Sequence, residues 1–129
     1  MRQISETFKA LSDEVPNEIM ALLFRHGELC LCDVEAILAA SQSEATHHLR
    51  ALCMAGLLEE RGEGFWAHYR VARHHSPELQ GVLDALRALV TDARAADLDA
   101  RYERWMAEKE FAGLVMPGAC CHQARVATA

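Results

Sequence analysis

The sequence lacks the features of several protein classes. It has no apolar run near the roughly 18 residues of a membrane span, and no apolar stretch with a basic flank and a cleavage site near its start. It also has no glycine-rich phosphate loop, no nucleophile with a placed base and no catalytic zinc spacing. We therefore expect one cytoplasmic domain without a membrane partner or an organic cofactor, and not an enzyme.

Basic residues are also few. The 129 residues include 13 Lys and Arg against 19 Asp and Glu, for a formal charge of −6. This balance argues against a generally basic nucleic-acid binder. Residues 41–75 carry four residues of each sign and five of the seven histidines, so positive potential is highest in this segment.

Cysteine, in contrast, is plentiful. Four of the five cysteines form two close pairs, Cys30 with Cys32 and Cys120 with Cys121. Structural disulfides are unusual in a reducing compartment, so the pairs indicate metal, metalloid or redox chemistry, or plain packing. Packing is the favoured role for Cys53.

Apolar periodicity predicts four helices in the first half of the chain. A short first helix ends near residues 12–13, and a second runs from Pro16 to His26. A third begins at the first cysteine pair. A fourth starts at residues 41–44, which have the Ser-x-x-Glu form of a capping box.

Two β-rich runs then predict a hairpin, from Leu58 to Arg61 and from Phe65 to Val71. Helix, turn, helix and hairpin in this order predict a mainly α fold with a β-hairpin wing, a winged helix-turn-helix. Ser76 and Pro77 begin a last long helix, which we expect to bend near residues 95–99.

The apolar first half of the last helix has no obvious partner in so small a domain. This favours a homodimer formed through the first and last helices. We assign residues 1–112 to the winged helix-turn-helix and dimerisation domain, and residues 113–129 to a flexible tail.

The first cysteine pair has a geometric constraint. Side chains two residues apart on a helix point about 200° apart, so both sulfurs can face one ion only if Cys30 is the non-helical N-cap. Asp33 supports this placement, because an acidic side chain at N3 can reach the cap amide. Two thiols hold a soft cation poorly, so Cys120 or Cys121 is the expected source of further sulfur.

The ordered motifs between residues 8 and 72 resemble the ArsR/SmtB family of bacterial metal-sensing transcription regulators. The segments that carry the resemblance are Lys9-Ala10-Leu11-Ser12-Asp13, Glu28-Leu29-Cys30-Leu31-Cys32-Asp33-Val34, Ser41-Gln42-Ser43, His47-His48-Leu49, Ala55-Gly56-Leu57 and Trp66-Ala67-His68-Tyr69-Arg70-Val71. The resemblance implies a homodimeric repressor that binds double-stranded operator DNA and releases it when an inducer binds. The Cys-x-Cys segment resembles the subgroup that binds trivalent arsenic or antimony.

Three features of the sequence depart from the family pattern. Residues 14–18 lack two basic residues that the family commonly has there, which predicts weaker operator binding. Glu35 stands where the arsenic subgroup often has a third cysteine. The last helix lacks the paired histidines of the zinc-sensing branch.

Candidate DNA-binding residues lie on the fourth helix and the wing. Residues early in a recognition helix read the major groove, and basic wing residues meet phosphates. On the helix they are Gln42, Ser43, Thr46, His47 and Arg50, and on the wing Arg61, His68, Arg70 and Arg73.

Three other functions remain open. A cadmium or lead sensor would use four thiolates, whereas pyramidal arsenic needs three. A redox switch would need a disulfide between Cys30 or Cys32 and the tail, because a bridge within Cys-x-Cys is strained. A protein of another class would bind metalloids through its thiols without operator function.

Overall fold

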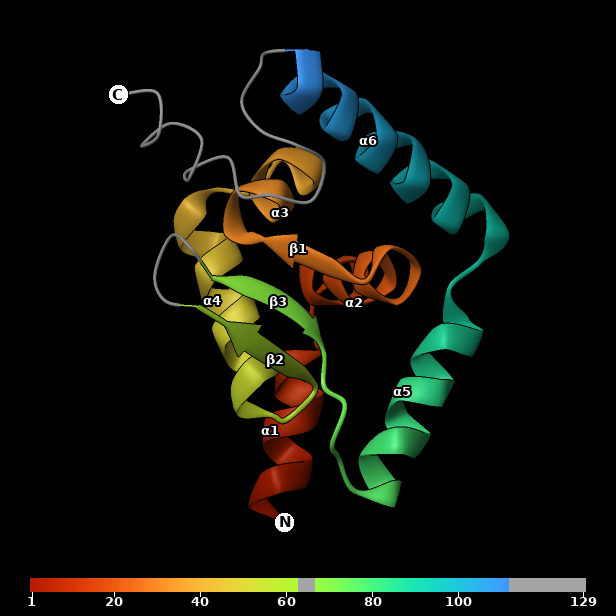
Figure 1. Cartoon of the computed structure of the whole chain (residues 1–129). Helices are drawn as coiled ribbons and strands as arrows, with labels where there is room; N and C mark the ends of the chain where they lie inside the picture. The colour runs from red at the N-terminus through yellow and green to blue at the C-terminus, as the bar shows by residue number, and fades with distance from the viewer. Residues whose placement is uncertain (63–66, 112–129) are drawn as a thin grey trace.

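A computed structural model describes residues 1–62 and 67–111, and Figure 1 shows their arrangement. The elements are, in chain order, α1 (Arg2–Ala10), α2 (Glu14–His26), β1 (Glu28–Cys30), α3 (Leu31–Leu38), α4 (Gln42–Met54), β2 (Leu58–Arg61), β3 (His68–Val71), α5 (Pro77–Leu89) and α6 (Asp92–Phe111). The predicted mainly helical fold with a hairpin wing is confirmed. Among the described residues, no helix is both long enough and apolar enough to cross a membrane.

Local capping residues set the starts of three helices. The Asp13 side chain accepts a hydrogen bond from the N–H of Glu14 at the start of α2. The Ser41 hydroxyl accepts a hydrogen bond from the Glu44 N–H at the start of α4. The Ser76 hydroxyl accepts one from the Leu79 N–H at the start of α5. Side-chain acceptors satisfy amides that have no partner within the helix, so these starts follow from local sequence.

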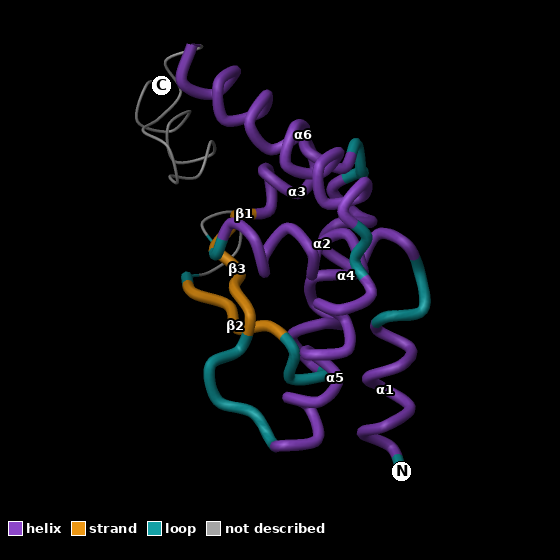
Figure 2. The backbone as a smooth tube through the Cα atoms, turned by 90° about the vertical axis from the view of Figure 1, so that its right-hand side faces the viewer, coloured by secondary structure: helices purple, strands orange, loops and turns teal. Residues whose placement is uncertain are grey.

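The core lies where α2, α3, α4 and the sheet meet. Figure 2 shows α2 running through the middle of the molecule between the sheet and the outer helices. Fully buried aliphatic side chains come from α2 and α4 and from the residue that precedes β2, among them Ile19, Leu22, Leu49, Leu52 and Leu57. Burial of such side chains drives the packing of these elements and fixes α3 and α4 relative to each other.

The sheet has a strand that sequence patterns did not predict. Its order is β1-β3-β2, all antiparallel, and β1 pairs with β3 so that Cys30 lies opposite His68. A strand of three residues is too short to show the alternation by which strands are recognised. β1 leads directly into α3 and therefore fixes the backbone at Cys30.

The last helix breaks earlier than predicted. α5 ends at Leu89, Val90 is extended, and the Thr91 hydroxyl accepts a hydrogen bond from the Arg94 N–H to cap α6. The predicted bend at residues 95–99 is therefore wrong, because the break follows the N-cap at Thr91. The break sends α6 back across α2 and α3 rather than away from the domain (Figures 1 and 2).

Candidate functional site

The first cysteine pair lies at the start of α3. Cys30 is the N-cap of this helix in an extended conformation, with φ −93° and ψ 173°, and Cys32 lies in the first turn. The two sulfurs are 2.9 Å apart, and the residues are 0% and 7% exposed. The predicted N-cap placement of Cys30 is confirmed, and it brings both sulfurs to one point where a single soft ion could bridge them.

Asp33 connects the cysteine pair to α6. Its Oδ2 accepts a hydrogen bond from the Cys30 N–H at 3.0 Å, as the capping pattern predicted. Its Oδ1 accepts from the Trp105 indole N–H and from the Lys109 ammonium, each at 2.8 Å. Trp105 also packs against Cys30 and Cys32. The carboxylate, the ammonium and the two cysteine side chains thus form one buried cluster between α3 and α6.

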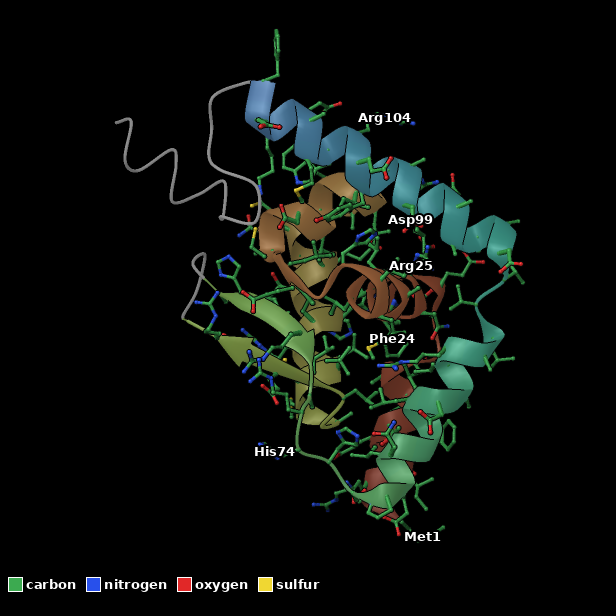
Figure 3. All side chains as sticks on the ribbon, turned by 45° about the vertical axis from the view of Figure 1, so that its right-hand side comes forward. Met1, Phe24, Arg25, His74, Asp99 and Arg104 are labelled. Atoms are coloured by element: carbon green, nitrogen blue, oxygen red, sulfur yellow. The ribbon has the colours of Figure 1, made fainter. Side chains whose placement is uncertain are left out.

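A second set of polar contacts holds the middle of α6 against the end of α2. Asp99 accepts hydrogen bonds from Arg25 and from His26 Nε2, and the His26 ring stacks on Tyr102. Figure 3 shows Arg25 and Asp99 facing each other across the two helices. The hydrogen bond from Arg25 holds the pKa of the Asp99 carboxyl below its ordinary value, and His26 adds to this effect. α6 is therefore fixed at two separate points along its length.

Sequence patterns did not predict Trp105 and Lys109 as part of the site. Both lie on the side of α6 that also buries Ala95 and Leu98, and Lys109 is only 1% exposed. A lysine in phase with an apolar stripe is unusual, because buried lysines need a charged partner. The position of Lys109 on the apolar side of α6 therefore indicates that it has a charged partner, although it does not identify the carboxylate.

The chain has three other cysteines, Cys53, Cys120 and Cys121. Cys120 and Cys121 lie outside the described residues. Cys53 is partly buried on α4, where burial first and Glu60 second raise the pKa of its thiol to about 11. Such a thiol is protonated at neutral pH, so Cys53 suits packing better than metal binding.

Four of the five predicted DNA-reading residues on α4 are exposed. Ala45, Leu49 and Leu52 face the core and leave the opposite face of the helix to solvent. Gln42, Ser43, His47 and Arg50 are exposed and Thr46 is partly so. α4 follows α3 directly, so the thiol pair lies one helix away from this face.

The wing residues predicted to contact phosphates differ in their partners and in their exposure. Arg61 forms an ion pair with Glu28, and Arg70 pairs with Glu59 at 2.9 Å. The Arg73 N–H and the Arg70 side chain hold the pKa of Glu59 below its ordinary value, so this carboxylate is charged at neutral pH. His68 is only 6% exposed. Its burial does not support a phosphate contact.

A cavity of about 570 Å³ lies between α2 and the α5–α6 junction. Phe24, Leu86, Leu89 and Leu98 supply much of its apolar lining. Neither the thiol pair nor any residue of α4 lines it. We therefore assign the cavity no part in the site.

Known proteins resemble part of this chain. Residues 13–60 match the family model described as "Bacterial regulatory protein, arsR family". An arsenical resistance operon repressor of Escherichia coli is 44% identical over 69 residues, which are 54% of this chain and 59% of that protein. A homolog of the cadmium resistance regulator CadC from Staphylococcus aureus is 40% identical over 76 residues, 59% of this chain and 63% of that protein.

A third relative is covered more fully. The arsenical resistance operon repressor of Bacillus subtilis is 34% identical over 83 residues, which are 64% of this chain and 76% of that protein. The chain thus covers less than two thirds of the first two relatives and three quarters of the third.

Solved structures show the same fold. HlyU from Vibrio cholerae superposes with a TM-score of 0.55 at 26% identity, covering 68% of this chain and 91% of HlyU. The winged helix-turn-helix DNA-binding domain of Mb0332 from Mycobacterium bovis, described as homodimeric, gives 0.55 at 25% identity, covering 68% of this chain and 78% of that one.

Proposed function

Because the chain belongs to the arsR family of bacterial regulatory proteins, we propose that it is a homodimeric transcriptional repressor induced by trivalent arsenic or antimony. In this proposal Cys30 and Cys32 bind the inducer and the protein then releases its operator. The observation that carries it is the pair of buried sulfurs, 2.9 Å apart, one helix before the exposed face of α4. Binding at the start of α3 can therefore act directly on the helix that meets DNA.

The exposed face of α4 supports a major-groove contact. Gln42 and Arg50 are both exposed and can pair with base edges, glutamine with adenine and arginine with guanine. Ser43, Thr46 and His47 lie on the same helix near its start, where helix-turn-helix proteins read bases. On the wing, Arg61 and Arg70 would exchange their carboxylate partners for phosphates. We expect affinity to fall steeply with salt.

Unpartnered apolar side chains support a homodimer. α1 exposes Ile4 and Phe8, which are 53% and 62% exposed, and α5 exposes Leu89 at 76%. These side chains lie on the first helix and on the first half of the split last helix, the elements proposed to pair. Light scattering on the Phe8→Glu variant should show a shift toward monomer, whereas Arg104→Met should remain dimeric.

The chemistry of the sulfurs supports a thiophilic inducer. Thiolates are soft ligands and prefer soft ions, which carboxylates do not hold well. Two sulfurs are fewer than pyramidal arsenic requires, and we propose that Cys120 or Cys121 supplies the third. Arsenite would condense with thiols and release water, leaving sulfur–arsenic bonds and no change in net charge.

A cadmium or lead inducer is the second candidate. It is favoured by the cadmium resistance regulator homolog at 40% identity. Four thiolates, two from each cysteine pair, would suit a tetrahedral cadmium ion. X-ray absorption separates the two candidates, because it counts three sulfurs around arsenic and four around cadmium.

The experiment is a gel shift with DNA from upstream of the protein's own gene, titrated with arsenite, antimonite, cadmium and zinc. We expect a shift at low salt and a roughly 5- to 150-fold loss of affinity with the inducer, the usual range of allosteric coupling. The double variant Cys120→Ser/Cys121→Ser should respond less, and Cys53→Ser should respond normally. If no shift forms at low salt, the chain is better described as a metalloid-binding protein without operator function.

A further inference from the structure

A buried carboxylate lies beside the thiol pair. Ligand atoms of Cys30, Cys32 and Asp33 all lie within 4.8 Å of one another, and Asp33 is 2% exposed. Two sulfurs with one carboxylate oxygen would suit zinc, which accepts sulfur, nitrogen and oxygen ligands. From these distances alone, the site would not distinguish zinc from arsenic.

The hydrogen bonds of Asp33 change this expectation. Both donors from α6, the Trp105 indole and the Lys109 ammonium, bind Oδ1, and the Cys30 N–H binds Oδ2. A carboxylate offers about four lone-pair positions, and three of them are taken by these donors. A metal ion at Asp33 would also be brought close to the Lys109 charge in a buried setting, where repulsion is poorly screened.

We propose that Lys109 and Trp105 are specificity-determining residues that keep Asp33 out of the coordination sphere, so that the site favours ions bound by sulfur alone. This inference rests on the proposed binding of a soft ion by Cys30 and Cys32. Moving the Asp33 carboxylate into the coordination sphere would cost its hydrogen bonds to α6. This cost lowers the affinity for zinc and similar ions, which gain from an oxygen ligand, and not the affinity for trivalent arsenic.

The two binding reactions can be compared by the charge that each brings to the site. Arsenite at neutral pH is a neutral trihydroxide, and each thiol that it binds releases one water, so no charge enters the site. A zinc ion carries two positive charges into the site, and two thiols release two protons as they bind it. The net charge of the site is therefore unchanged in both reactions, and Lys109 opposes zinc only where the ion binds Asp33, because the ammonium and the ion then compete for one carboxylate.

The position of Lys109 on α6 makes this role possible. The contacts of Asp99 with Arg25 and His26, and of Arg94 with Glu18, hold the first half of α6 on α2. This leaves Trp105 and Lys109, four residues apart on one face, directed at the start of α3. Arg104 lies next to Trp105 on the same helix and is exposed. It is labelled in Figure 3.

The experiment compares zinc and arsenite affinities of the full chain by competition, for the natural protein and for variants. Lys109→Met should raise zinc affinity relative to arsenite by about tenfold or more, because Asp33 loses the ammonium with which a zinc ion competes for its carboxylate. Arg104→Met loses the same charge at an exposed position and should change the ratio less than about twofold. Lys109→Arg restores the charge and should keep the natural ratio.

Two further measurements identify the carboxylate as the gained ligand. X-ray absorption of zinc-loaded Lys109→Met should show one more oxygen neighbour than the natural protein shows. In the double variant Asp33→Asn/Lys109→Met the gain in zinc affinity should disappear. An unchanged ratio in Lys109→Met, an equal change in Arg104→Met, or a gain that persists without Asp33 would each overturn the inference.

A second variant, Trp105→Phe, tests the inference if Lys109→Met does not fold. If circular dichroism shows that Lys109→Met is unfolded, Trp105→Phe removes only one neutral donor and should still raise relative zinc affinity by about threefold. No change in that variant would overturn the inference. Failure of the proposed function looks different, because Cys30→Ser/Cys32→Ser would then bind arsenite as well as the natural protein does.

Discussion

The buried ion pair between Asp33 and Lys109 predicts a large and non-additive loss of stability when either residue is replaced. The residues are 2% and 1% exposed, and the Oδ1–Nζ distance is 2.8 Å. Removing one member of a buried pair costs about 3 to 5 kcal/mol, because the remaining charge stays in a poorly solvated place. Both single variants therefore fall in the range of severe destabilisation.

The two single variants differ in what they leave behind. Lys109→Met leaves a carboxylate that still accepts from the Cys30 N–H and the Trp105 indole, so its cost should be near 3 kcal/mol. Asp33→Asn removes the charge that Lys109 faces and also places an amide NH₂ where an acceptor caps α3. Loss of a cap adds about 1 kcal/mol, so its cost should be near 4 kcal/mol.

The double variant Asp33→Asn/Lys109→Met tests the reasoning. It buries no charge at this place, so its cost should be about 4 kcal/mol rather than the sum of about 7, a coupling at the upper end of that seen for contacting residues. Urea denaturation followed by circular dichroism measures all three variants, at one fixed protein concentration because dimers gain stability by mass action.

An exposed substitution on the same helix is the control. Arg104→Met should change the free energy of unfolding by less than about 0.5 kcal/mol. Single-variant costs below about 1 kcal/mol would show that the pair is accessible to water and is not a buried pair. Strictly additive costs would show that the two residues do not interact, and either result would contradict a buried ion pair between Asp33 and Lys109.

Three further predictions concern other parts of the molecule. The pKa of Asp99 is lowered by its hydrogen bond from Arg25, so the ionised carboxylate stabilises the fold above the ordinary carboxyl pKa, and this contribution is lost as pH falls through the lowered pKa. In urea denaturation Asp99→Asn should therefore cost about 0.5 to 1 kcal/mol near pH 7 and progressively less as the pH falls below the ordinary carboxyl pKa. Glu59→Gln should raise operator affinity a few-fold in fluorescence anisotropy, because it releases Arg70 and removes a negative charge from the wing; equal or weaker binding would count against a phosphate contact by the wing. Cys53, whose thiol has a pKa of about 11, should react slowly with iodoacetamide near pH 7.5 in the folded protein, and fast labelling by mass spectrometry would contradict its packed position.

Elements defined by local chemistry could be predicted from the sequence. The N-cap at Cys30 with Asp33 at N3, and the cap at Ser41, depend on side chains that meet within one helical turn. The exposed face of α4 followed in the same way from the phase of its apolar residues. Patterns of this kind act over a few residues, so the sequence displays them directly.

Contacts between distant residues could not be predicted in the same way. The Asp33 carboxylate meets Trp105 and Lys109 across 72 and 76 residues, and no local pattern selects that carboxylate from the others in the chain. The direction of α6 depends on the cap at Thr91, which the apolar periodicity of the last helix does not show. The strand β1 was missed because three residues show no periodicity.

The central claim is that inducer binding at the thiol pair weakens the hold of α4 on DNA. Fluorescence anisotropy of a labelled operator fragment, titrated with arsenite at fixed salt, tests it in the natural protein and in Cys30→Ser/Cys32→Ser. Saturating arsenite should lower operator affinity by roughly 5- to 150-fold in the natural protein and leave the variant bound. Equal release from both proteins, or no release from the natural protein at saturating arsenite, would contradict it.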